Sequence, residues 1–230
     1  GLFYFAHLDP ATSSHNYALV VAHKEVFFDY QTSKKEWRVV VDHIKYWSPS
    51  PGKPISVEEV DDYVADLNMK FCLGVVTYDH FNSQASIVKL RKKGIPTKMT
   101  PFTKQYKNII YDNLYQMIIQ KRLLIPNHLL LKNEMKNLQR KWLNNGYKVY
   151  PKKDGDVTTD DICDALAGAC YNCMEKELNK LPQGKLVSLP VQGSNDVVWR
   201  SMSGQPYGVG PGQQVARKLE QRNSYPQRGV

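Results

Sequence analysis

Two apolar segments of strand length each end in an aspartate, and this pattern restricts the fold more than any other feature of the sequence. Residues 3–8 are followed by Asp9, and residues 71–78 are followed by Asp79. A buried carboxylate is costly unless it meets a positive group or a metal ion. Pro10 cannot donate a ladder hydrogen bond, so we expect strand pairing to stop just after Asp9. Both acids are therefore predicted at strand exits, and the alternative for Asp9 is an Asx turn that caps the following loop.

The order of the apolar segments predicts a mixed sheet. Three antiparallel strands come first: residues 3–8, residues 17–22 continued by 25–30, and residues 37–47. Ser56 and Glu59 form a capping box that begins a crossover helix of about three turns. The apolar run that ends at Asp79 is typical of a strand buried on both faces, as in parallel sheets. We expect an α/β fold with a central sheet of five or more strands, three antiparallel and then parallel, flanked by helices.

Helices and short strands are expected to alternate over the rest of the domain. The predicted helices cover residues 81–90, 104–120, 128–143 and about 160–180, and the predicted short strands cover residues 97–102 and 147–150. Thr158 or Thr159 is expected to cap the last helix. From residue 183 the composition changes to Gly, Pro, Gln and Ser, which cannot bury much apolar surface. We therefore predict a domain over residues 1–181 and a flexible C-terminal tail over residues 182–230.

The charge of the chain favours a polyanionic partner. Lys and Arg number 31 against 22 Asp and Glu, which gives a formal net charge of +9. We expect nucleic acid rather than a membrane, because no apolar run approaches the ~18 residues of a membrane helix. The start of the chain shows no secretory signal, so we expect a soluble, intracellular protein, and more narrowly a domain excised from a longer polypeptide.

The four cysteines do not indicate a disulfide framework. Cys170 and Cys173 have the spacing of a zinc-binding pair, but the sequence has no second pair. Cys163, Cys170 and Cys173 also fall on the apolar stripe of the last predicted helix, together with Leu166 and Met174. We therefore expect these three cysteines in the core.

Acidic residues from three separate places are the candidate metal ligands. Asp9 and Asp79 follow strands, and Asp160 and Asp161 begin the last helix. Two carboxylates ~4 Å apart repel by roughly 4 kcal/mol at an effective dielectric of 20, so three in one pocket require cations. Oxygen ligands suit Mg²⁺ or Mn²⁺, and two such ions ~3.5–4 Å apart would serve phosphodiester cleavage. The alternative for Asp160 and Asp161 is stabilisation of the positive helix end. Asp164 lies one turn later, on a face with small residues that permit close packing against a strand.

Four short motifs follow one another along the chain. They are Tyr78-Asp-His-Phe-Asn-Ser-Gln84, Gly94-Ile-Pro96, Arg122-Leu-Leu-Ile-Pro126 and Asp160-Asp-Ile-Cys-Asp-Ala165. In this order and spacing they resemble the C-terminal nuclease domain of viral terminase large subunits, the DNA-packaging motors of tailed phages. The resemblance covers roughly residues 1–180. It implies a ribonuclease H-like fold for this part of the chain.

The resemblance also implies roles for individual acids. By position, Asp9, Asp79 and Asp161 would be the catalytic residues and would bind two Mg²⁺ or Mn²⁺ ions, with Asp160 as a further metal ligand. Asp164 matches the second acid of that helix in the family, and we expect it beside the ligands.

Further candidates adjoin these acids. His80 follows Asp79 and is a candidate contact of the scissile phosphate or of a metal-bound water, and the alternative is an ordinary polar histidine at a strand end. The candidate DNA contacts are basic residues in a turn of the antiparallel strands and just before the last helix, namely Lys34, Lys35, Lys152 and Lys153. Phosphate contacts of this kind confer little sequence preference.

The activity implied by the resemblance is metal-dependent endonuclease cleavage of double-stranded DNA, largely without sequence preference, by a two-metal-ion mechanism during viral genome packaging. The expected partners are double-stranded DNA, an ATPase domain upstream in the same polypeptide, the portal and the small terminase subunit, in the cytoplasm of a bacterial host. This chain contains no G-x-x-x-x-G-K-[ST] phosphate loop, so we do not expect it to hydrolyse ATP. Two alternatives stay open: a Holliday-junction resolvase or integrase-like relative of the same fold, and a non-catalytic module that docks on DNA or on the portal.

Overall fold

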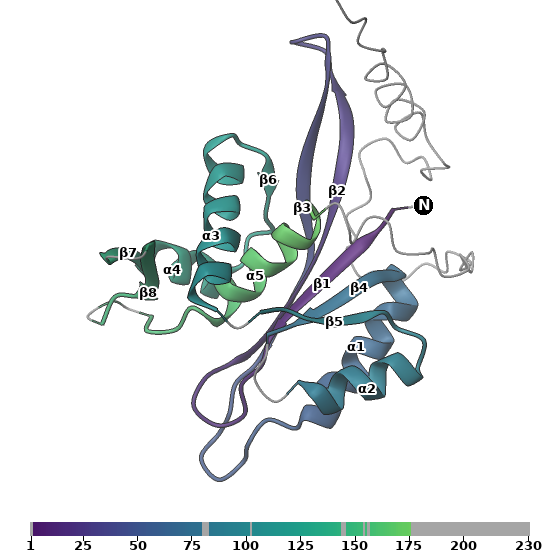
Figure 1. Cartoon of the computed structure of the whole chain (residues 1–230), viewed down its shortest axis with the longest axis vertical. Helices are drawn as coiled ribbons and strands as arrows, with labels where there is room; N and C mark the ends of the chain where they lie inside the picture. Colours follow the sequence, from purple (N-terminus) through teal and green to yellow (C-terminus); the bar gives the residue numbers. More distant parts are fainter. Residues whose placement is uncertain are drawn as a thin grey trace, which may run out of the picture.

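A mixed sheet of six strands forms the centre of the molecule (Figure 1). The computed structural model describes residues 2–79, 83–101, 103–143, 146–153, 155 and 157–175. The strands are β1 (Tyr4–Asp9), β2 (Tyr17–Asp29), β3 (Lys34–Trp47), β4 (Leu73–Tyr78), β5 (Thr97–Met99) and β6 (Leu123–Leu124). They lie in the order β5-β4-β1-β2-β3-β6. β1, β2 and β3 are antiparallel neighbours, whereas β4 is parallel to β1, β5 to β4 and β6 to β3. The predicted mixed α/β sheet, antiparallel first and then parallel, is confirmed.

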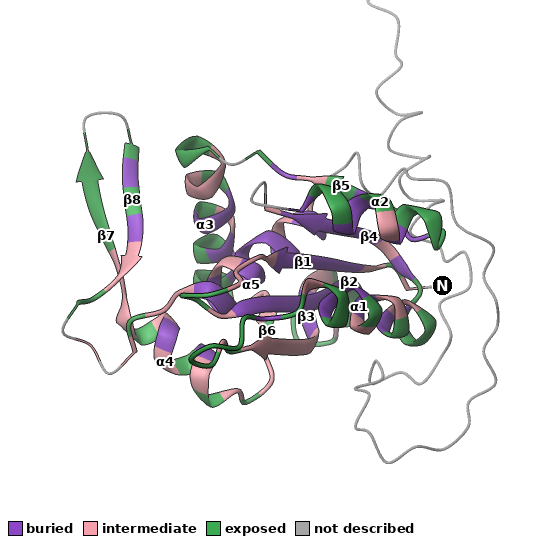
Figure 2. Cartoon of the chain, turned by 90° about the horizontal axis from the view of Figure 1, so that it is seen from below, coloured by how far each residue is buried: buried purple, intermediate pink, exposed green. Residues whose placement is uncertain are grey.

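Helices cover both faces of this sheet. They are α1 (Val57–Phe71), α2 (Gln84–Lys92), α3 (Lys104–Ile119), α4 (Leu129–Asn137) and α5 (Asp161–Asn172). α3, α4 and α5 share one hydrophobic core with the sheet, and α1 and α2 share a second core on the opposite face. Figure 2 shows that the sheet strands and the inward sides of the helices are buried. No helix in the described ranges is both long enough and apolar enough to span a membrane.

The alternation of side chains along β1 determines which of its residues point to each face of the sheet. Phe5 belongs to the core beneath α5, whereas Ala6 and Leu8 belong to the core beneath α1 and α2. Because side chains alternate along a strand, His7 and Asp9 point to the same face as Phe5. The first strand therefore directs its terminal acid toward α5.

Helix α5 packs closely against β1 through a glycine. A methyl group placed on Gly168 would lie 2.2 Å from Cδ2 of His7. The predicted close packing of this helix against a strand is therefore present in the structure. Cys163, Cys170 and Cys173 are buried free thiols on the same helix and its end, as expected for core residues.

The crossover helix begins where the sequence indicates. The Ser56 hydroxyl accepts a hydrogen bond from the Glu59 amide at 3.3 Å, which caps α1. The helix has 15 residues and is longer than the predicted three turns. It also takes up Phe71, which we predicted as the first residue of the following strand. Cys72 adopts a left-handed conformation (φ 49°) and separates the helix from β4.

The predicted helix over residues 128–143 is wrong in its second half. α4 ends at Asn137, and β7 (Leu138–Leu143) pairs antiparallel with β8 (Gly146–Pro151) as a separate hairpin. Figure 2 shows this hairpin projecting away from the main sheet. Pairing with the adjacent strand overrides helical periodicity here: Arg140 lies over the Tyr147 ring at 4.0 Å, and Trp142 packs on the same ring at 5.5 Å. The predicted strand 147–150 is thus one half of this hairpin.

Several other boundaries differ from the predictions. α2 begins at Gln84, and β5 ends at Met99 rather than at residue 102. Asp160, not Thr158 or Thr159, occupies the cap position of α5. β6 was not predicted, because two residues carry no periodicity. α5 ends at Asn172, while the predicted end of the domain at residue 181 and the tail 182–230 lie outside the described residues, so both stay predictions.

Candidate active site

Asp9 and Asp79 leave the sheet side by side. β1 and β4 are parallel neighbours in which Leu8 pairs with Tyr78, and the Asp79 amide donates a hydrogen bond to the Leu8 carbonyl at 3.2 Å. Thr77 faces α5, because it accepts a hydrogen bond from Asn172 of that helix at 2.6 Å. Asp79 therefore continues toward α5, as Asp9 does. The carboxyl ends of two adjacent parallel strands deliver both acids to one place.

The start of α5 brings Asp161 to the same region. Asp161 is 5% exposed, and its Oδ2 atom accepts a hydrogen bond from the Asn16 amide at 2.9 Å. Its Oδ1 atom lies 3.7 Å from Nδ1 of His15. Both contacts come from the loop that follows Asp9, so this loop joins the first strand to the N-terminal end of α5.

The acids influence one another electrostatically. Burial raises the pKa of Asp9 well above its usual range, and the charges of Asp164, Asp161 and Asp79 raise it further, whereas Lys107 opposes them. Burial also raises the pKa of Asp161, against the effect of its hydrogen bond from Asn16. The predicted acids therefore share one region rather than pointing to different parts of the molecule.

The same acids are not arranged around a single point. In the described part of the chain, no three or more His, Cys, Asp or Glu side chains are grouped as they would be around a metal ion. The donor set still fits Mg²⁺ or Mn²⁺, because it consists of carboxylate oxygens whose mutual repulsion a divalent cation would relieve. The residues that could hold such ions are Asp9, Asp79 and Asp161.

Helix α3 supplies two residues that the sequence analysis missed. Nζ of Lys107 lies 2.6 Å from Oδ2 of Asp164 and 3.4 Å from Oδ2 of Asp160. The Tyr111 hydroxyl donates to Oδ1 of Asp164 at 2.5 Å. Both oxygens of Asp164 are thus engaged by α3, and Asp160 is drawn to the same lysine. Lys107 and Tyr111 are four residues apart and so share a helix face, but this spacing does not show which helix they meet.

Glu134 of α4 is a third missed residue. It is fully buried and accepts hydrogen bonds from the Cys163 amide at 3.0 Å and from the Thr159 hydroxyl at 2.8 Å. Burial raises its pKa to about 7. The side chain therefore caps the first turn of α5 from another helix, in the place where we expected a threonine to do so. An isolated acid in a short helix gives no sequence signal for this role.

The predicted DNA contacts lie in two different places. Lys34 and Lys35 are exposed at the far end of the β2–β3 hairpin, where Asp29 pairs with Lys34 (Figure 1). Ala18 pairs with Asp9, so the hairpin end is about 11 residues away along β2, or roughly 35 Å at strand rise. Lys152 and Lys153 are exposed on the segment between β8 and α5. His80 lies outside the described residues, and its predicted role stays untested.

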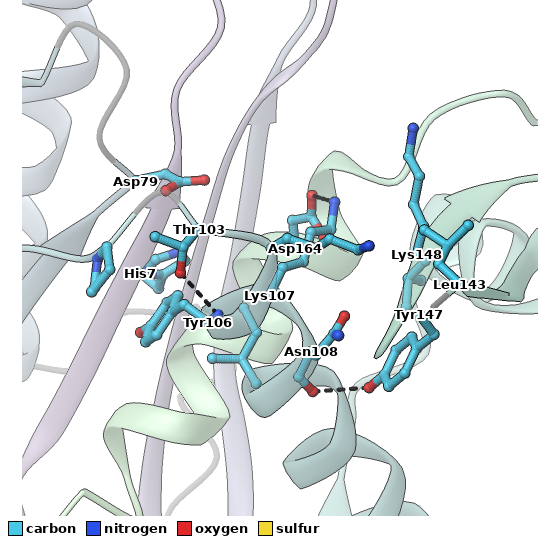
Figure 3. A pocket seen from close by; sticks show the side chains of 14 residues that line it. His7, Asp79, Thr103, Tyr106, Lys107, Asn108, Leu143, Tyr147, Lys148 and Asp164 are labelled. Atoms are coloured by element: carbon cyan, nitrogen blue, oxygen red, sulfur yellow. Dashed lines mark hydrogen bonds and ion pairs between the residues drawn. The ribbon is translucent and has the colours of Figure 1, made fainter. Parts of the chain in front are cut away.

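A pocket of about 390 Å³ opens beside the acids, between α3 and the β7–β8 hairpin (Figure 3). Asp79 and Asp164 line one part of it, and Tyr106, Asn108 and Tyr147 line other parts. Figure 3 shows Asp79 and Tyr106 on one side of this space and Tyr147 on the other, with Asn108 of α3 next to Tyr147. Of the acids discussed above, Asp79 and Asp164 therefore border this pocket, whereas Asp9 and Asp161 do not line it.

Comparison with solved structures identifies the architecture. The large terminase nuclease of thermophilic phage G20c superposes with a TM-score of 0.56 at 16% sequence identity, covering 74% of this chain and 82% of that chain. The chain has the fold of phage large-terminase nuclease domains. Thermus phage P74-26 large terminase nuclease domain matches equally, with a TM-score of 0.56, 16% identity and coverage of 76% of this chain and 82% of that one.

Other terminases give the same result. The HK97 bacteriophage large terminase matches with a TM-score of 0.56 at 15% identity, over 74% of this chain but 39% of that longer chain. A second structure of the G20c terminase nuclease carries bound magnesium. No protein-family model matches the sequence, and no curated protein matches it. The predicted likeness to the fold of terminase nuclease domains is thus confirmed by structure at low sequence identity.

Proposed function

We propose that this chain is the nuclease domain of a terminase large subunit and that it cleaves double-stranded DNA with divalent metal ions, largely without sequence preference. The observation that carries this proposal is the side-by-side exit of Asp9 and Asp79 from adjacent parallel strands, facing the start of α5 with Asp161. Three carboxylates in one partly buried region are what a pair of divalent cations would stabilise. The terminase fold supports the same activity.

Asp9, Asp79 and Asp161 would hold two Mg²⁺ or Mn²⁺ ions, with Asp160 as a further ligand at the edge. Bound ions of this kind lower the pKa of an attacking water and stabilise the leaving 3′ oxygen. Residues of the chain itself would set the geometry. The Asn16 amide fixes the orientation of Asp161 at 2.9 Å.

DNA would run along the surface that joins the acids to the β2–β3 hairpin. The roughly 35 Å between Asp9 and the hairpin end corresponds to about one helical turn of B-form DNA, ~34–36 Å. Lys34 and Lys35 would then contact phosphates one turn away from the cut, and Lys152 and Lys153 would contact phosphates closer to it. Contacts to phosphates alone account for low sequence preference and predict steep salt dependence.

The wider context follows from the same proposal. An ATPase domain in the same polypeptide would drive DNA translocation, and the portal and the small terminase subunit would be the packaging partners in the cytoplasm of a bacterial host. The nuclease would supply the DNA cut that packaging requires.

Plasmid cleavage tests the site directly. With Mn²⁺ or Mg²⁺, the wild-type protein should nick and linearise supercoiled plasmid, and Asp79→Asn should lose this activity at unchanged side-chain volume. Asp66→Asn is the matched control, because Asp66 is an exposed acid of α1 on the other face of the sheet. Equal cleavage by wild type and Asp79→Asn would refute the proposed site.

Metal binding separates the nuclease from its alternatives. An ion that binds the folded site stabilises the protein by mass action, by about 2.7 kcal/mol at 100 times its Kd. Millimolar Mn²⁺ should therefore raise the melting temperature of the wild type and of Asp66→Asn, but much less that of Asp79→Asn. No stabilisation of the wild type would favour a non-catalytic docking module. Cleavage confined to four-way junctions would favour a resolvase.

A further inference from the structure

We propose that the pocket between α3 and the β7–β8 hairpin binds one nucleotide of the DNA strand being cut, with the base inside the pocket and the phosphate toward the acids. This inference rests on the proposed nuclease function, which by itself requires only contacts to the DNA backbone. It adds a base-binding site and a local distortion of the duplex at the cut.

The size and walls of the pocket suit a base. Its volume of about 390 Å³ lies within the range of sites that bind small organic ligands, roughly 300–1,000 Å³. Ile110, Leu143 and Val149 give apolar walls, and Tyr106 and Tyr147 add aromatic rings. Base–aromatic stacking contributes about 1–3 kcal/mol per base and is tolerant of sequence. The walls would therefore accept any of the four bases.

Contacts on both sides fix the aromatic wall. The Tyr147 hydroxyl lies 2.9 Å from the Asn108 carbonyl and 2.7 Å from Oδ1 of Asp112, and its hydrogen can be donated to either. The guanidinium of Arg140 covers one face of the Tyr147 ring at 4.0 Å. The hairpin is thereby held against α3, and the pocket exists before any ligand binds. A preformed site loses less entropy on binding.

Charges are distributed unevenly around the pocket. Asp79 and Asp164 line the part next to the catalytic acids, and Lys104, Lys107 and Lys148 also line the pocket. Lysines are point-charge partners for phosphate, whereas a neutral base gains from the apolar walls. An anionic phosphate can approach the acids only together with cations. The arrangement therefore orients a nucleotide with its phosphate between the lysines and the metal site.

The Asn108 side chain is a polar group placed to contact the base. The Asn108 side-chain amide lines the pocket and makes no hydrogen bond within the described residues. A methyl group on Gly146 would lie 2.7 Å from Nδ2 of Asn108, and Gly146 has φ +95°, so the glycine both turns the chain and leaves room for the amide. An amide can donate and accept, and every base edge offers complementary groups. A single adaptable contact of this kind is compatible with low sequence preference.

A base in this pocket must leave the DNA stack. Unstacking and unpairing cost a few kcal/mol, and the cost is smallest for a mismatched base. The proposal therefore predicts that the wild-type protein cuts a duplex with one mismatch at or beside the mismatch, about tenfold faster or more than the matched duplex.

The test uses Leu143→Trp, which fills the pocket from a partly exposed position, and Asn108→Ala, which removes the amide and leaves the pocket open. Leu129→Trp is the matched control, because Leu129 is 74% exposed and does not line the pocket. Far-UV circular dichroism and melting temperature establish that each variant folds. If Leu143→Trp does not fold, Asn108→Ala alone carries the test.

The first measurement is binding of 2-aminopurine deoxyribonucleoside 5′-monophosphate in the presence of Mg²⁺, which supplies the cations that the phosphate needs beside the acids, and it is monitored by fluorescence quenching. The wild type and Leu129→Trp should quench the probe, and Leu143→Trp and Asn108→Ala should bind it about tenfold more weakly. The second is cleavage of mismatched against matched duplex with Mn²⁺, where the pocket variants should cut both duplexes more slowly than the wild type and should lose the preference for the mismatch.

The two proposals fail in different ways. A wild-type protein that cuts plasmid but neither quenches the probe nor prefers a mismatch overturns the pocket inference and leaves the nuclease standing. Equal probe binding by wild type and both pocket variants overturns it as well. A protein that binds the probe but never cuts refutes the nuclease, whereas the base-binding pocket stands.

Discussion

Gly168→Ala is predicted to destabilise the protein and to disturb the active site, although helix propensity alone predicts the opposite. Alanine is better than glycine in a helix interior by about 1 kcal/mol. In this structure, however, the new methyl carbon would lie 2.2 Å from Cδ2, 2.3 Å from Cγ and 2.6 Å from Nε2 of His7. Carbon atoms in favourable contact are about 3.5–4.0 Å apart, so α5 or His7 must move by about 1 Å.

His7 has little freedom to move aside. It is 3% exposed, and its Nδ1 lies 2.7 Å from the Thr77 hydroxyl, which also receives a hydrogen bond from Asn172. Overpacking of a tight core costs about 1–3 kcal/mol, and more where the neighbours are fixed. After the gain in helix propensity, we expect a net loss of about 2 kcal/mol. For a chain of this size that corresponds to a fall of about 4–8 °C in melting temperature.

Urea denaturation followed by circular dichroism measures this effect. Gly74→Ala is the control, because the nearest atoms to its new methyl group lie at 3.5 Å, an ordinary contact distance. We expect Gly74→Ala to change stability by less than about 1 kcal/mol. In the double variant Gly168→Ala/His7→Ala the clash is relieved, so the two losses should not add. A Gly168→Ala protein as stable as the wild type would refute the packing argument.

The same substitution should also lower the cleavage rate of protein that is still fully folded. α5 carries Asp161, and β1 carries Asp9, so a shift between the two elements changes the distance between proposed metal ligands. Misplacement of about 1 Å can cost on the order of 100-fold in rate. The measurement is plasmid cleavage at a temperature where both proteins are fully folded. Unchanged cleavage in a destabilised Gly168→Ala protein would mean that α5 does not set the site.

Three further predictions concern the contacts of α3 and α4 with α5. Tyr111→Phe should lose about 1–3 kcal/mol of stability in urea denaturation because it removes a hydrogen bond to a partly buried carboxylate. Tyr115→Phe, half exposed on the same helix, should stay within about 0.5 kcal/mol. Lys107→Met removes a cation beside the acids, so millimolar Mn²⁺ should raise the melting temperature of this variant more than that of the wild type. A smaller rise would contradict the placement of Lys107 beside the proposed metal ligands. Glu134 has a folded pKa of about 7, raised by burial and by Asp161 and Asp160 from an ordinary 4.5, so it binds more protons when folded. Its contribution to the free energy of unfolding is complete below pH ~4.5 and is lost as the pH rises through ~7. This contribution is at most about 3 kcal/mol. Glu134→Gln should therefore flatten this part of the measured pH–stability profile.

The sequence was sufficient for the mixed type of the sheet and for the places of Asp9 and Asp79 at strand ends, because both depend on patterns that a single chain displays. The start of α5 was also predicted to within one residue, whereas the pairing of β1 with β4 was not predicted. The β7–β8 hairpin was missed, because residues 138–143 keep a helical spacing of apolar side chains and the strand forms only through pairing with residues 146–151. Metal-ligand geometry depends on side-chain placement, which no periodicity encodes.

Lys107, Tyr111 and Glu134 were missed for a related reason. Each lies on a helix whose apolar stripe predicts only that the helix packs, and the partner of each polar group lies 25 or more residues away along the chain. A sequence pattern shows which face of a helix is buried. It does not show which helix meets that face, so a polar contact between two helices cannot be identified before the fold is known.

These contacts together explain how α5, although distant in sequence, is held in place beside the ends of β1 and β4. Gly168 sets the distance between α5 and β1, Glu134 caps the first turn of α5, and Tyr111 holds Asp164 one turn further along. The distance of α5 from β1, the place where α5 begins and its rotation about its own axis are thus each fixed by a different contact. Because Asp161 is carried on that first turn, its position relative to Asp9 is determined by packing before any ion binds. In the proposed nuclease, divalent ions would then be bound by rotation of the carboxylate side chains rather than by movement of a helix.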